Sequence, residues 1–410
     1  MFDAEARTEL KLGWPILVAC AIGVGCSAVA LPFYSIGPMT KPIAAATGWS
    51  RSEIQFAIVF SSGIGALLSP LIGWAIERFG PRAVALPSLV GVAIGLFVAS
   101  LATSLPMFWA GYGLSAILGA GSNPVLWSRV IAGSFERARG TALGLALVGT
   151  ALVALLLPNL VAVIEPAQGW RTTLRVISAL PLVVALPTVY FLLHPKRLMT
   201  ATALGAALRG LDVGQALRSY RFWILTASIL AGYLAISGAG PNLVPTFTDQ
   251  GIAPASAAAI ASVYAISMIP GRIMVGILMD RFWAPAVAFV VLALPALGCL
   301  ILSHAHGAPM LVLACMLIGL AAGAELDVLA FMTARYFGLR HYPKIYALSY
   351  VALATGSATA PTIFSYLQQS TGSYTMSFYI AAGLFIVASV LMLLLGRYPH
   401  EFEIGATNEA

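Results

Sequence analysis

Long apolar runs separated by short polar segments extend through the whole chain. Such runs can be followed at 14–36, 54–76, 83–103, 106–133, 141–164, 172–193, 222–248, 254–279, 284–303, 309–334, 344–368 and 374–396. A helix needs about 20 apolar residues to cross the hydrocarbon of a bilayer. The runs are continuous, whereas the strands of a membrane β-barrel alternate apolar and polar residues. The pattern therefore predicts an all-α membrane protein with twelve transmembrane helices.

Two matching loops indicate an internal repeat. The segment 73–82 follows the second run, and the related segment 276–282 follows the eighth, 203 residues later. The longest polar stretch divides the runs into two sets of six. We therefore predict two pseudo-symmetric six-helix bundles, at 1–193 and 222–410, joined by a cytoplasmic linker at 194–221. Substrate sites in transporters built this way lie near the bilayer midplane, where the halves meet.

Composition and charge support this prediction and exclude others. Hydrophobic residues make up 60% of the chain and charged residues only 9%, whereas a soluble domain carries about 25% charged residues. The net charge of +7 does not indicate nucleic-acid binding, because the basic residues lie in short clusters between apolar runs. Sixteen of them fall on one side of the predicted membrane and four on the other, which predicts that both termini are cytoplasmic. The four cysteines lack metal-ligand spacing, so neither a metal nor a cofactor is predicted.

The loop motifs carry a resemblance to a known family. Residues 73–82 resemble G-x-x-x-D-R-x-G-x-R, the signature loop of the major facilitator superfamily, with Glu77 in the acidic position. The segment 276–282 is a degraded copy that lacks the final Gly and Arg. A finer resemblance, to the bacterial monocarboxylate and oxalate:formate branch, rests on the segments 48–53, 135–144, 271–272, 323–327 and 335–338.

The resemblance implies a secondary transporter for a carboxylate-bearing organic anion, commonly driven by proton symport. The oxalate exchangers of this branch carry a basic residue in the eleventh helix, but 346–366 contains no Lys or Arg. This departure favours a substrate with one carboxylate over a dicarboxylate.

Charged side chains of the two loops can bond the ends of neighbouring helices and favour closure of the cytoplasmic side. We therefore predict that the loops act as gates. Arg129, near the inner end of the fourth helix, is a further gate candidate, although snorkelling to the interface is an equal alternative. The other predicted gating residues are Gly73, Glu77, Arg78, Arg82, Asp280 and Arg281.

Three ionisable residues lie inside predicted spans of the second half, where each costs about 2.5–3.5 kcal/mol on insertion scales. Arg272 in the eighth helix is predicted at nearly the same depth as Glu325 and Asp327 in the tenth. Its planar guanidinium either binds the substrate carboxylate or forms a structural ion pair with one of the acids. The two acids point about 200° apart on a helix, so both cannot face the cavity. We favour Glu325 as the cavity-facing, proton-coupling acid and Asp327 as a partner within the C-terminal half, while a structural role for either stays open.

Neutral polar residues add weaker candidates for substrate binding. At the repeat offset of 202 residues, Glu325 corresponds to Asn123 in the fourth helix, which places polar groups at matching positions of both halves. Tyr34, near the outer end of the first helix, can donate a hydrogen bond, although tyrosine is common at membrane interfaces in any case. Asn242, Tyr264 and Tyr350 are weaker candidates.

Motifs of other functional classes do not occur. The sequence contains no nucleophile elbow, His-rich metal set or phosphate loop, so no enzyme is predicted, and duplicated halves favour alternating access over a passive channel. We expect a monomeric proton symporter in the lipid bilayer of a bacterial inner membrane, with a small organic anion and protons as substrates. An efflux pump for amphipathic molecules and an anion exchanger are the alternatives.

Overall fold

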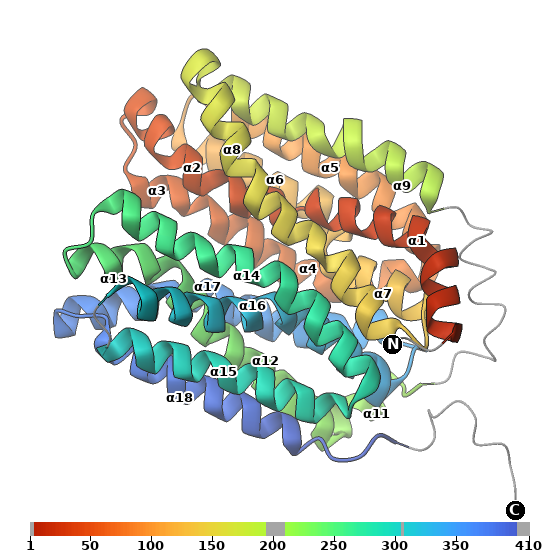
Figure 1. Cartoon of the computed structure of the whole chain (residues 1–410). Helices are drawn as coiled ribbons and strands as arrows, with labels where there is room; N and C mark the ends of the chain where they lie inside the picture. Colours follow the sequence, from red (N-terminus) through yellow and green to blue (C-terminus); the bar gives the residue numbers. More distant parts are fainter. Residues whose placement is uncertain (1–3, 194–209, 305–306, 400–410) are drawn as a thin grey trace, which may run out of the picture. The chain divides into compact units, whose positions relative to one another are not determined.

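A computed structural model describes residues 4–193, 210–304 and 307–399 of the 410-residue chain. These residues form helices, with one isolated β-bridge between Gly210 and Gly338. The chain divides into two compact units, and Figure 1 shows the helices of both. The predicted linker lies partly outside the described residues, so its extent stays a prediction. The first unit comprises Met1–Ala138 and Leu145–Leu204, and the second comprises Arg139–Gly144 and Gly205–Ala410.

The first unit is built from the helices between α1 and α9, except that the first six residues of α8 belong to the second unit. The helices are α1 Ala4–Gly25, α2 Ala30–Thr47, α3 Arg51–Gln55, α4 Ala57–Phe79, α5 Pro81–Ser100, α6 Leu105–Gly119, the 3-10 turn η1 Ala120–Ser122, α7 Pro124–Ser134, α8 Arg139–Leu180, the π-helical turn η2 Pro181–Ala185 and α9 Leu186–Leu192.

The second unit contains the helices from α11 to α18. They are α11 Val213–Arg218, α12 Tyr220–Ala239, the 3-10 turn η3 Gly240–Asn242, α13 Leu243–Asp249, α14 Pro254–Arg281, α15 Ala284–His304, α16 Ala308–Phe337, α17 Tyr342–Thr371 and α18 Thr375–Leu393.

Proline and glycine mark many helix ends. Pro81 and Pro124 open α5 and α7 at the first helical position, where the missing N–H of proline leaves no hydrogen bond unmade. Gly48 and Gly372 follow α2 and α17 with φ of 76° and 75°, a left-handed conformation that glycine adopts without a steric penalty. Proline and glycine residues therefore define several of the helix ends.

Three of the predicted spans are broken helices. The run 14–36 is divided between α1 and α2, the run 106–133 is interrupted by η1 and Asn123, and the run 222–248 is interrupted by η3. Breaks of this kind are tolerated at membrane depth where protein covers the backbone. Both Asn123 and Asn242, at two of the breaks, are buried.

Nine helical segments of the described residues are long and apolar enough to cross a membrane. One of them, Arg139–Leu192, covers two predicted spans that are separated by a kink at Gly169. The run 106–133 is not among the nine because its break divides it into short helices. The run 344–368 forms the 30-residue helix α17, but its Ser, Thr and Tyr residues lower its hydropathy.

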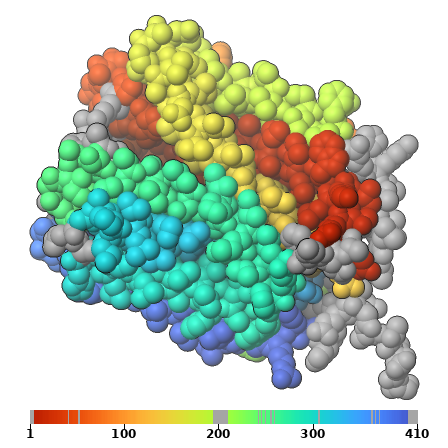
Figure 2. Space-filling view, viewed as in Figure 1, coloured from red at the N-terminus to blue at the C-terminus, as the bar shows by residue number. Residues whose placement is uncertain are grey.

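Apolar side chains also cover the outside of the helices. Leu12, Leu67, Val163, Val183 and Phe191 are each more than 70% exposed. Figure 2 shows the outer surface that α14 and α15 form on the second unit. A soluble protein rarely exposes apolar surface on this scale. The chain is a multi-pass membrane protein.

Candidate functional site

Helices α14 and α16 of the second unit pack more closely than ordinary side chains allow. Gly319 lies against the carbonyl of Tyr264, and Gly323 lies against the carbonyl of Met268. A Cβ at either glycine would overlap the carbonyl oxygen. Small residues at such contacts let membrane helices approach each other closely.

The contacts repeat every four residues and continue to a buried ion pair. Arg272 and Asp327 follow Met268 and Gly323 by four residues, and the partners in each contact are 55 residues apart along the chain. The two helices are therefore parallel, with a fixed register. Arg272 Nη1 donates to Asp327 Oδ1 at 3.2 Å, and the two side chains are only 3% and 0% exposed.

The ion pair does not use all of its hydrogen-bonding capacity. Arg272 Nε and Asp327 Oδ2 are buried and have no hydrogen-bond partner among the described residues. Buried polar atoms in folded proteins are normally paired, and a guanidinium carries five donors in a planar fork that matches a carboxylate. The arrangement is therefore able to bind a further carboxylate.

Glu325 points to a different helix. Its side chain is buried, neither carboxyl oxygen has a hydrogen-bond partner among the described residues, and it lies against Gly232 of α12. An ionised carboxylate without a partner is strongly disfavoured in a low-dielectric interior. This position suits a carboxyl group that holds a proton.

Three tyrosines of α17 form a buried stack in the same unit. The rings of Tyr342 and Tyr346 are 5.6 Å apart, and those of Tyr346 and Tyr350 are 6.2 Å apart. The Tyr346 hydroxyl has no hydrogen-bond partner among the described residues, and Asp327 is one of its electrostatic neighbours. Tyr346 is a candidate site residue that was not predicted from the sequence. The four-residue spacing of the tyrosines, which places them on one helix face, was the available signal.

Asn123 is a buried polar residue of the first unit. It precedes α7 at the break in the fourth span, and neither atom of its side-chain amide has a hydrogen-bond partner within the described residues. Its amide nitrogen lies 3.6 Å from the position of a Cβ on Gly65 of α4. In transporters, the N-termini of discontinuous helices can face anionic substrates. At the predicted repeat offset of 202 residues Asn123 corresponds to Glu325, and each of the two is buried in its own unit.

The remaining substrate-binding candidates have other contacts. Asn242 donates from its side chain to the carbonyl of Gly238 in its own helical segment, at 2.7 Å. The Tyr264 hydroxyl lies 3.3 Å from the position of a Cβ on Gly240, at the break in the seventh span. Tyr34 packs edge-on against the neighbouring Phe33 ring at 5.1 Å. Of the predicted site residues, the structure brings together Arg272 and Asp327.

The signature loop of the first unit contacts the end of a neighbouring helix. Arg82 donates to the carbonyl of Tyr190 in α9 at 2.9 Å, and its guanidinium lies over the Tyr190 ring at 4.7 Å. The Arg78 guanidinium lies over the Trp74 ring at 5.5 Å. Gly73 is buried in α4, Glu77 lies in the last turn of that helix, and Arg129 is half-buried in α7.

Asp280 holds the first turn of α8 within the second unit. It accepts hydrogen bonds from the backbone N–H groups of Gly140 and Thr141 at 2.6 and 2.7 Å, and from the Thr141 hydroxyl at 2.7 Å. A carboxylate at a helix N-terminus satisfies free N–H groups and interacts favourably with the helix dipole. Asp280 is followed by Arg281, the last residue of α14.

Two glycine substitutions distinguish an effect on the Glu325 carboxyl from an effect on helix packing. A methyl group in Gly232→Ala would overlap only the flexible end of Glu325, so we expect a folded protein with an altered pH dependence of transport. A methyl group in Gly323→Ala would overlap backbone, and overpacking of this kind costs about 1–3 kcal/mol. Thermal unfolding in detergent and uptake at several pH values measure both effects. Equal loss of stability in the two variants would contradict the expectation that Gly232→Ala displaces only the Glu325 side chain.

Comparison with known proteins identifies the family. The model of the major facilitator superfamily matches residues 20–324 and 225–409. Monocarboxylate transporter 13 of Bos taurus is 28% identical over 366 residues, which cover 88% of this chain and 82% of that protein. Monocarboxylate transporter 11 of Mus musculus is 26% identical over 406 residues, which cover 94% of this chain and 88% of that protein.

Solved structures agree on the fold. The human organic anion transporter MFSD10 has a TM-score of 0.71 at 18% identity, covering 92% of this chain and 99% of that chain. The fucose:proton symporter FucP of E. coli has a TM-score of 0.66 at 15% identity, covering 94% of this chain and 99% of that chain. The predicted twelve-helix transporter fold is confirmed, and the relatives are transporters rather than enzymes. The chain belongs to the major facilitator superfamily.

Proposed function

We propose that this transporter moves a monocarboxylate across the bacterial inner membrane together with a proton, by alternating access. The observation that carries the proposal is the buried pair of Arg272 and Asp327, which keeps an unused donor and an unused acceptor. A buried ion pair contributes little net stability compared with apolar residues of similar size. An ionisable group inside a membrane span is costly, so a role in function is the first explanation for it.

Competition for Arg272 provides a physical basis for coupling. A substrate carboxylate that binds the unused donor of Arg272 shares the guanidinium with Asp327 and adds a negative charge to the buried site. A buried charge without a partner of its own is costly, so entry of the anion is favoured when a proton enters with it. Glu325 is the proposed proton carrier because it is buried and its oxygens have no hydrogen-bond partner among the described residues. Asp327 is the alternative carrier.

The names of the relatives support the substrate class. Two of them are called monocarboxylate transporters, and FucP is described as a proton symporter. Asn123, Tyr34, Asn242 and Tyr264 are the further proposed substrate contacts. We retain cytoplasmic termini and a monomeric state as part of the proposal.

Uptake by purified protein in proteoliposomes tests the proposal. We expect accumulation of a labelled short monocarboxylate when the external solution is more acidic than the interior, and loss of accumulation with a protonophore. Thermal-shift measurements over organic acids at two pH values identify the preferred substrate. Equal stabilisation by dicarboxylates, or stabilisation only by amphipathic cations, would contradict a site for a single carboxylate.

The gating role of the loops predicts a kinetic defect. Asp280→Asn replaces a charged acceptor of three hydrogen bonds with a neutral amide, and a hydrogen bond to a charged group contributes about 1.5–3 kcal/mol. We expect turnover to fall about tenfold or more, while the equilibrium Kd for substrate stays close to that of the wild type. Arg82→Gln is expected to behave in the same way. Weaker binding at unchanged turnover in either variant would argue against a gate.

A further inference from the structure

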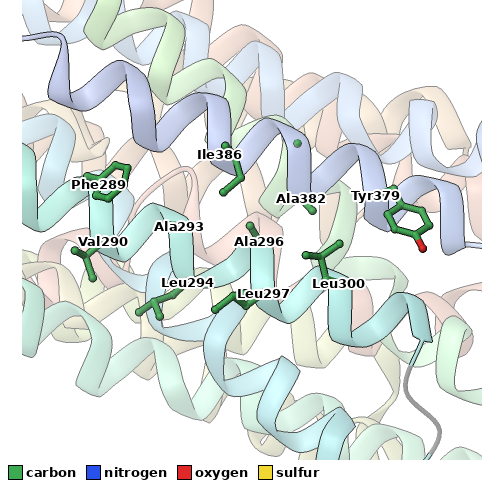
Figure 3. A pocket seen from close by; sticks show the side chains of 11 residues that line it. Phe289, Val290, Ala293, Leu294, Ala296, Leu297, Leu300, Tyr379, Ala382 and Ile386 are labelled. Carbon is green, nitrogen blue, oxygen red and sulfur yellow. The ribbon is translucent and has the colours of Figure 1, made fainter.

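An apolar groove runs along the outside of the second unit between α15 and α18 (Figure 3). Its volume is about 560 Å³. Ala296 and Ala382 are buried at its base, whereas Val290 and Leu297 are each 55% exposed at its side. The groove therefore lies open to whatever surrounds the helices.

The length of the groove is about half the thickness of the bilayer hydrocarbon. Both α15 and α18 are long and apolar enough to span a membrane. The lining of α15 extends from Phe289 to Leu300, which is about 16 Å at 1.5 Å per residue. The hydrocarbon of a bilayer is about 30 Å thick, so the groove covers roughly half of it. A single acyl chain fits such a groove in length and in polarity.

A polar pair closes one end of the groove. The Tyr379 hydroxyl, which lies at the end of the groove in Figure 3, is 2.7 Å from His304 Nε2. His304 Nδ1 is 3.1 Å from the carbonyl of Leu300. A carbonyl only accepts, so in the neutral ring Nδ1 carries the proton and Nε2 accepts from the Tyr379 hydroxyl. The phenol oxygen is then left as an acceptor at the membrane interface, where tyrosine is common.

We propose that this groove binds one acyl chain of a membrane phospholipid whose headgroup donates hydrogen bonds, as the ammonium of an ethanolamine headgroup does. The chain lies between α15 and α18 along Ala293 and Gly383, and the headgroup donates to the Tyr379 oxygen. A choline headgroup has no N–H donor and binds less well. With the predicted cytoplasmic termini, the lipid belongs to the outer leaflet.

Gly383 offers a direct test of the acyl-chain site. No atom lies within 4 Å of a Cβ built on Gly383, so Gly383→Leu fills the groove without disturbing the fold. Ala293→Phe fills it from α15. Val387 is exposed on α18 but does not line the groove, so Val387→Leu is the matched control. Native mass spectrometry of the delipidated full chain, titrated with phosphatidylethanolamine, measures the lipids that each chain retains.

We expect the wild type and Val387→Leu to retain one more phosphatidylethanolamine per chain than Gly383→Leu and Ala293→Phe. Equal retention in all four proteins would overturn the acyl-chain site, as would a dimer of the wild type that the groove-filling variants abolish. Tyr379→Phe tests the headgroup. We expect it to bind phosphatidylethanolamine and phosphatidylcholine of the same acyl chains equally, whereas the wild type prefers the ethanolamine lipid. An unchanged preference in Tyr379→Phe would overturn the headgroup assignment.

Discussion

Replacing Arg272 with Ala is expected to abolish monocarboxylate uptake. Truncating one partner of a buried hydrogen-bonded charge pair costs about 2–5 kcal/mol, which is a loss of roughly 30- to several-thousand-fold in affinity. Arg272→Lys is expected to recover little, because an ammonium cannot bind a carboxylate through two parallel hydrogen bonds. Uptake of labelled substrate and binding by thermal shift measure the effect.

The same substitution leaves Asp327 buried without its partner, so loss of stability must be separated from loss of binding. In the double variant Arg272→Met with Asp327→Leu, apolar side chains replace the pair, and such replacements are often neutral or stabilising. We expect this protein to be stable and inactive. The exchange variant Arg272→Asp with Asp327→Arg keeps an ion pair but moves the guanidinium to α16, and we expect it to be folded and inactive. Near-wild-type uptake by either double variant would show that the pair is only structural.

Glu325→Gln is expected to remove the dependence of net uptake on the proton gradient. In the wild type, uptake should rise as the external pH falls, because the carrier must be protonated on the side from which substrate enters. The amide of the variant cannot take up or release a proton. Exchange of labelled for unlabelled substrate needs no deprotonation, so we expect exchange to persist while net accumulation is lost. Parallel assays of accumulation and exchange across several pH values measure this difference.

Asp327→Asn is the matched comparison for Glu325→Gln. It removes the charge that competes with substrate for Arg272, so we expect tighter binding of the anion and a pH dependence that resembles the wild type. The reverse result, with pH dependence lost in Asp327→Asn and kept in Glu325→Gln, would assign the transported proton to Asp327.

Hydropathy predicted the spans well but not their interruptions. The runs 14–36, 106–133 and 222–248 each read as one helix, whereas the structure breaks all three. A sliding count of apolar residues is insensitive to backbone conformation, and an interior Gly or Pro in a membrane helix is often tolerated without a break. Whether Asn123 ends one helix and begins another depends on the neighbours that satisfy the freed backbone groups.

The directions in which Glu325 and Asp327 point could be predicted only in part from the sequence. Helical periodicity requires Glu325 and Asp327 to point in different directions. Gly319, Gly323 and Asp327 are spaced by four residues, and this spacing already places Asp327 on the small-residue face that a neighbouring helix covers. The identity of that helix, and the register of 55 residues that brings Arg272 to Asp327, follow only from the packing of α14 against α16.

The sequence by itself determined that this protein is a helical membrane transporter built from a repeat, because span length, hydropathy and loop motifs are local properties of the chain. It also identified the charged residues that hydrocarbon tolerates only at a cost. The tertiary structure alone decided that Arg272 pairs with Asp327, that Glu325 lies against Gly232, and that Tyr346 and the groove at Gly383 exist as candidate sites. These features depend on contacts between residues far apart in sequence, and such contacts are set by how the helices pack.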